Sequence, residues 1–99
     1  MEIIEDFDIK SVPHHAIVMV ATSEPDYNMD RVMIIEDWPK YSNVTVISGS
    51  HCSCYGFDEI DWDALVYTEA EFEKLLEGWQ SSGYGAEKLI ADLWKASNR

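Results

Sequence analysis

The sequence is short of positive charge. Its 99 residues hold 7 lysines and arginines against 19 aspartates and glutamates, which gives a formal net charge of −12. Domains that bind DNA or RNA through phosphates need clustered Lys and Arg side chains, so this composition excludes that class. No apolar run reaches the roughly 18 residues that a membrane span requires, and no basic segment followed by an apolar stretch predicts a secretion signal.

Cysteine is equally scarce. Cys52 and Cys54 are the two in the chain, and a single residue separates them. A disulfide between them would close a small, strained ring outside ordinary disulfide geometry. We therefore expect free thiols, and together with the missing secretion signal this predicts a cytoplasmic protein.

Apolar residues are not lacking. Hydrophobic residues make up 46% of the chain and aromatic residues 12%, which is enough to build a core. Disordered acidic tails lack such residues, so the sequence is not of that class. At this length we expect a single domain spanning residues 1–99.

Short apolar runs rich in β-branched residues predict strands over residues 16–21, 31–35 and 43–47, and a shorter one over 64–67. The first run is apolar throughout, which predicts a central strand buried on both faces. Connections of roughly eight residues favour an antiparallel meander. Residues 1–10 fit either a helical turn or an edge strand.

The hydrophobic period changes in the last third of the chain. Thr68 followed three residues later by Glu71 fits a capping box, which predicts that a helix begins there. Two apolar stripes at helical spacing follow, and they comprise Phe72, Leu75, Leu76 and Trp79, then Ala86, Leu89, Ile90, Leu93 and Trp94. The predicted fold class is α+β, a three- to four-stranded, mostly antiparallel sheet with two C-terminal amphipathic helices packed on one face.

The densest group of potential metal ligands is His51, Cys52 and Cys54, with His14 and His15 elsewhere in the chain. Thiolate and imidazole bind zinc, and a structural zinc site needs four ligands. The Cys-x-Cys spacing argues against zinc, because zinc sites place two to four residues between paired cysteines. We therefore expect packed cysteines and no cofactor. A small metal- or thiol-dependent domain centred on these three residues stays as the alternative.

Catalytic and calcium-binding motifs fit poorly. An EF-hand loop beginning at Asp61 would have Leu65 where the third ligand belongs and Val66 where the turn glycine belongs. The acids that follow Cys54 would oppose the thiolate that a nucleophilic cysteine needs. No phosphate-binding glycine loop, nucleophile elbow or HExxH motif occurs in the chain. We expect a protein that is not an enzyme.

The uneven distribution of charge is the most unusual feature. Residues 1–77 hold 17 acidic and 4 basic residues, whereas residues 78–99 hold 2 and 3. Such a surface either keeps the protein soluble or engages a basic partner, with Trp62 and Trp38 beside acids as aromatic anchors. The residues predicted to contact a partner are Asp58, Glu59, Asp61, Trp62, Asp63, Glu69, Glu73 and Glu77.

Three segments of the chain are similar to a pattern found in other proteins. They are Trp38-Pro39-Lys40, Asn43–Val46 and Gly49–Phe57. Together they resemble a pattern in small, uncharacterised proteins encoded by bacteriophages and their bacterial hosts. The resemblance covers about the middle quarter of the chain, and its distinctive part is Cys52-Ser53-Cys54-Tyr55-Gly56. It implies a context in which small acidic proteins often inhibit host machinery, as anti-CRISPR proteins and DNA mimics do.

Charge and resemblance together suggest a function. We expect a binding protein that engages a basic, nucleic-acid-handling host protein and inhibits it by charge mimicry, without contacting nucleic acid or membrane itself. Carboxylates would occupy the Lys and Arg sites of the partner, and electrostatic steering would speed the encounter. A structural or homodimeric module with no inhibitory role is a further possibility.

Overall fold

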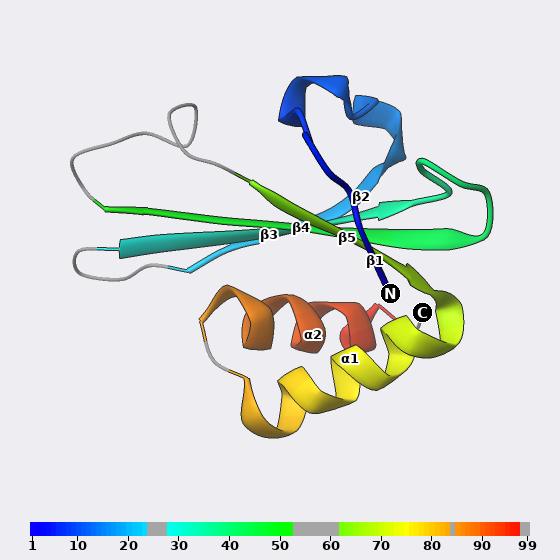
Figure 1. The fold of residues 1–99 in the computed structure, drawn as a ribbon. Coiled ribbons are helices and arrows are strands. Elements are labelled where there is room, and N and C mark those ends of the chain that lie inside the picture. The colour runs from blue at the N-terminus through cyan, green and yellow to red at the C-terminus, as the bar shows by residue number, and fades with distance from the viewer. Residues whose placement is uncertain (24–27, 53–61, 84, 98–99) are drawn as a thin grey trace.

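Five strands form one antiparallel sheet in the order β1-β5-β4-β3-β2 (Figure 1). The computed structural model describes residues 1–23, 28–52, 62–83 and 85–97. The strands are β1 (Glu2–Ile3), β2 (Ile17–Thr22), β3 (Asn28–Glu36), β4 (Asn43–Cys52) and β5 (Asp63–Thr68). The helices are α1 (Glu69–Ser82) and α2 (Ala86–Ala96), and short 3-10 turns span Ile9–Ser11 and His14–Ala16.

The two helices cover one face of the sheet and the N-terminal segment lies over the other (Figure 1). Because side chains alternate between the faces of a strand, β3 supplies Val32 and Ile34 to the helix side and Met33 and Ile35 to the other. Each helix packs on different strands, α1 against β4 and β5 and α2 against β2 and β3. The sheet is therefore buried on both sides.

The core on the helix side is the larger of the two. Ile34 and Ile90 are fully buried there, and burying each such side chain contributes about 1.5–3 kcal/mol. The buried members are Ala21, Val32, Ile34, Val44, Val46, Phe72, Leu76, Ala86, Ile90, Ala91 and Trp94. The opposite core comprises Val12, Met33, Ile35, Ile47 and Ala64, with Phe7 and Trp38 among the half-buried residues packed against it.

The structure confirms the α+β class and corrects its details. The sheet has five strands rather than three or four, because Glu2–Ile3 forms a short edge strand beside β5. A 3-10 turn follows at Ile9–Ser11. The apolar run at residues 16–21 does not form a central strand, since β2 closes one edge of the sheet. On α2, Leu89 and Leu93 are 42% and 43% exposed, so the apolar stripe predicted for that helix is only partly buried.

Helix α1 begins at the predicted capping box. The Thr68 hydroxyl accepts from the backbone N–H of Glu71 at 3.2 Å, and the Glu71 carboxylate accepts from the backbone N–H of Thr68 at 3.0 Å. The other carboxylate oxygen of Glu71 accepts from the Met1 ammonium at 2.7 Å, which ties β1 to the helix. This ammonium and the Thr68 N–H lower the pKa of Glu71 from 4.5 to about 2.

A pH-dependent contribution to stability follows from that lowered pKa. Because the folded protein holds Glu71 ionised more strongly than the unfolded chain does, its contribution is full above pH 4.5 and disappears as the pH falls toward 2. We expect the Glu71→Gln variant to be less stable than the wild type at pH 7 and to approach it as the pH falls. Urea unfolding across this range measures the difference, and a constant difference would contradict the assignment.

Candidate partner-binding groove

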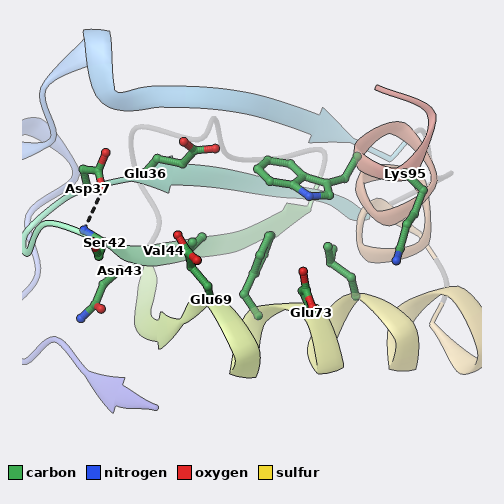
Figure 2. A pocket seen from close by; sticks show the side chains of 11 residues that line it. Glu36, Asp37, Ser42, Asn43, Val44, Glu69, Glu73 and Lys95 are labelled. Carbon is green, nitrogen blue, oxygen red and sulfur yellow. Dashed lines mark hydrogen bonds between the residues drawn. The ribbon is translucent and has the colours of Figure 1, made fainter. Parts of the chain in front are cut away.

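A half-open groove lies where three parts of the fold meet at one end of the sheet (Figure 2). There β3 leads into the loop to β4, β5 passes into α1, and α2 ends. The groove has a volume of about 180 Å³. Its lining residues are Glu36, Asp37, Ser42, Asn43, Val44, Glu69, Phe72, Glu73, Leu76, Trp94 and Lys95.

The floor of the groove is apolar and rigidly packed. Val44 comes from the helix-facing side of β4, and Phe72 comes from the buried stripe of α1. The ring of Phe72 meets that of Trp94 edge-on, with centroids 5.1 Å apart and planes at 86°. Such aromatic pairs contribute about 0.5–1.5 kcal/mol beyond the area they bury, so this floor is part of the core.

Carboxylates form the walls. Glu69 and Glu73 rise from α1 one turn apart, and Glu36 approaches from the end of β3 (Figure 2). Asp37 follows Glu36, and among the described residues Lys95 of α2 is the one basic residue in the lining. The described part of the lining thus sets four carboxylates and a single ammonium around an apolar floor.

The Asp37 side of the groove is held by its own loop. The Asp37 carboxylate accepts from the backbone N–H of Ser42 at 2.7 Å, and the Asp37 N–H donates to the Asn43 carbonyl at 2.9 Å. Asp37 and Ser42 both have positive φ values, 57° and 69°, which Asp tolerates better than most residues. These contacts fix the Asp37 carboxylate at the rim.

The two carboxylates that α1 contributes to the groove, those of Glu69 and Glu73, are weakly compensated within the described part of the fold. Glu69 and Glu73 lie at i and i+4, where like charges cost about 0.2–0.5 kcal/mol. Neither forms an ion pair with any residue that the structure describes. Two side-chain ion pairs lie away from the groove, between Lys88 and Asp92 at 3.0 Å and between Lys40 and Glu2 at 3.8 Å. A bound cation would therefore relieve repulsion in the groove.

Glu36 and Asp37 also border a second hollow, beside the N-terminal segment. It has a volume of about 330 Å³, and Trp38 and His15 line it with Pro13, Ala16 and Val18. The ring of Trp38 packs edge-on against Phe7 at a centroid distance of 6.3 Å. The two acids at the end of β3 therefore border both hollows.

The structure brings together only part of the predicted site. Glu69 and Glu73 line the groove, whereas Glu77, further along α1, is exposed outside its lining. Asp63 begins β5, so about 17 Å of extended strand separate it from the end where α1 starts. Trp62 is half-buried against the core under the N-terminal segment, as Trp38 is. Asp58, Glu59 and Asp61 lie outside the described residues.

Sequence reasoning missed Glu36, Asp37 and Lys95. Glu36 and Asp37 could have been found from the sequence, because they directly follow the strand predicted over residues 31–35. Glu69 likewise lies just after the strand predicted over residues 64–67. In an antiparallel meander alternate strands run the same way, so the carboxyl ends of β3 and β5 lie at the same end of the sheet. Lys95 required the position of α2, which no pattern in the sequence supplies.

The alternative metal centre cannot be placed. Cys54 lies outside the described residues, and for His51 and Cys52 only the strand backbone is described. Among the side chains that the structure does describe, no group of three or more His, Cys, Asp or Glu residues is arranged to hold a metal ion. The expectation of packed cysteines and no cofactor remains a prediction.

Comparison with protein-family models, curated proteins and solved structures gives no match to this chain. Across the described ranges, no helix is both long enough and apolar enough to cross a membrane. We therefore infer the kind of ligand that the groove binds from the side chains that line it. That chemistry, an apolar floor with acidic walls, suits a ligand that combines a hydrocarbon stem with a positive charge.

Proposed function

We propose that the protein is a non-enzymatic binding protein whose acidic groove receives a basic segment of a partner protein. The observation that supports this most directly is the described lining of the groove, in which Glu36, Asp37, Glu69 and Glu73 surround Phe72 and Trp94 with one lysine among these residues. The formal net charge of −12 adds a long-range attraction toward a positively charged partner.

Arginine and lysine side chains match both parts of the groove. Their hydrocarbon stems cover apolar surface while the charged heads stay in polar surroundings, so a stem would lie over Phe72 and its head would meet Glu69 or Glu73. Arginine is the better match, because its planar guanidinium donates two parallel hydrogen bonds to a carboxylate. A basic peptide segment is thus the favoured ligand.

The partner we propose is a nucleic-acid-handling protein of the host, with inhibition by competition. Lys and Arg side chains that hold phosphates would be occupied by carboxylates of this chain, and nucleic acid would be displaced. The acidic composition and the resemblance to small phage-encoded proteins support this role, in which anti-CRISPR activity is one form of such inhibition. Charge mimicry of this kind weakens with salt, because screening shortens the reach of exposed charges.

Binding of a labelled oligo-arginine peptide, followed by fluorescence anisotropy, tests the proposal. We expect Glu69→Gln/Glu73→Gln to weaken binding about tenfold, since each exposed ion pair contributes up to about 1 kcal/mol. Asp63→Asn/Glu77→Gln changes the net charge equally outside the groove, and we expect it to weaken binding less than about twofold. Equal losses in the two double variants, or affinity independent of salt, would refute a groove-centred site.

A further inference from the structure

The acidic groove has a positive end as well as acidic walls. Lys95, in the last turn of α2, lines it together with four carboxylates. Figure 2 shows Lys95 on the α2 side and Asp37 beside the end of β3, far apart in this view. Glu69 and Glu73 of α1 lie between them. The charges of the described lining are therefore segregated along the groove rather than mixed.

The ammonium of Lys95 is not engaged by the described part of the fold. Lys95 forms no ion pair with any residue that the structure describes, although four carboxylates line the same groove. The end of α2 has other donors for its carbonyls. The Ser97 N–H donates to the Leu93 carbonyl at 3.1 Å, and the Ser97 hydroxyl donates to the Trp94 carbonyl at 2.8 Å. The ammonium thus stays available to an anionic group that enters the groove.

The groove is the size of a single side chain. Its volume of about 180 Å³ is below the roughly 300–1,000 Å³ of pockets that hold drug-sized ligands. It is close to the roughly 150 Å³ of an apolar cavity that holds benzene. One residue of a partner therefore fills it. A residue inside a chain must continue out of the groove in two directions, whereas the last residue of a chain continues in only one.

We propose that the groove binds the C-terminal arginine of a partner chain. The guanidinium would meet Glu69, the hydrocarbon stem would lie over Phe72, and the terminal α-carboxylate would meet the Lys95 ammonium. An internal arginine supplies the cation and the stem but has no carboxylate for Lys95. This ligand rests on the proposed function, because the arginine cation must bind the acidic walls, and it narrows a basic segment to a basic chain end.

A free C-terminal carboxylate separates this ligand from general attraction to an acidic protein. A chain of net charge −12 repels an added negative charge, so overall charge favours a peptide whose C-terminus is amidated. An ion pair with Lys95 favours the free carboxylate instead. A preference for the free acid therefore requires a positive group at the site and cannot come from the charge of the whole molecule.

NMR titration of the full chain with two dipeptides tests the proposal. One is N-acetyl-Gly-Arg with a free α-carboxylate, and the other is its C-terminal amide. We expect the wild type to bind the free acid about threefold more tightly, and Lys95→Met to lose this preference. Lys88→Met is the matched control, because it removes the same charge from the same helix about two turns away, outside the described lining. We expect it to keep the preference.

The chain-end ligand is refuted if the wild type binds the amide as tightly as the free acid, or if neither dipeptide binds. It is also refuted if Lys88→Met loses the preference as fully as Lys95→Met does. The oligo-arginine peptide, titrated into the wild type and Glu69→Gln/Glu73→Gln, decides the proposed function separately. If the double variant weakens that binding while the dipeptides show no preference for the free acid, the proposed function stands and the chain-end ligand alone fails.

Discussion

Replacing Ile90 by alanine is expected to lower the free energy of unfolding by about 2–5 kcal/mol. Ile90 is fully buried between α2 and the sheet, so the change removes apolar contact and leaves a cavity in the larger core. Native domains are stable by about 5–15 kcal/mol, so a loss of about 5 kcal/mol from a wild type at the lower end of that range would leave part of the population unfolded at room temperature. Chemical denaturation followed by circular dichroism measures the loss.

Ile3→Ala is the matched control for that variant. It removes the same atoms from a side chain that is 70% exposed in β1, and surface substitutions of this kind usually stay within about 0.5 kcal/mol. A similar loss in both variants would mean that α2 does not pack against the sheet as described. A large loss at Ile90 alone supports the packing that also positions Trp94 and Lys95 at the groove.

Reversing the charges of Glu69 and Glu73 on α1 is expected to abolish the ability of the protein to compete with nucleic acid for a basic peptide. In the proposed mechanism the wild-type chain releases labelled duplex DNA from an oligo-arginine peptide, because its carboxylates occupy the arginines. The Glu69→Lys/Glu73→Lys variant replaces attraction by repulsion at two positions. We expect the concentration needed for half release to rise about 10–100-fold, with each reversed position contributing about 1 kcal/mol.

A second double variant separates the groove from the overall charge of the molecule. Asp63→Lys/Glu77→Lys changes the net charge by the same amount at positions outside the groove lining. We expect this variant to release DNA with at most a several-fold loss, since both positions act only through a screened field. If the two double variants lose equally, general acidity rather than the groove carries the effect.

The fold was largely predictable because its signals are local. The capping box at Thr68 and the apolar stripes placed both helices, and the β-branched runs placed four of the five strands. The position of each strand within the sheet was not predictable, because an apolar run indicates that a strand is buried but does not indicate which strands pair with it. β2 has the composition of a central strand and yet lies at an edge of the sheet.

The groove was predictable only in part, because it is assembled from distant segments. The spacing of Glu69 and Glu73 placed them on one flank of a helix, and the structure puts both on the groove wall. Glu36, Asp37 and Lys95 join them through strand order and helix position, which depend on tertiary packing. The role of Asp58, Glu59 and Asp61 stays a prediction, since they lie outside the described residues.

We propose that basic ligands bind in the groove over Trp94 and not across the acidic surface at large. A two-dimensional NMR titration with an oligo-arginine peptide tests it most directly. We expect the largest shifts at the indole N–H of Trp94 and at the backbone amides of Glu36, Asp37 and Glu69–Glu73, while the indole signal of Trp62 stays in place. Shifts spread evenly over the acidic residues, or centred on residues 58–63, would contradict it.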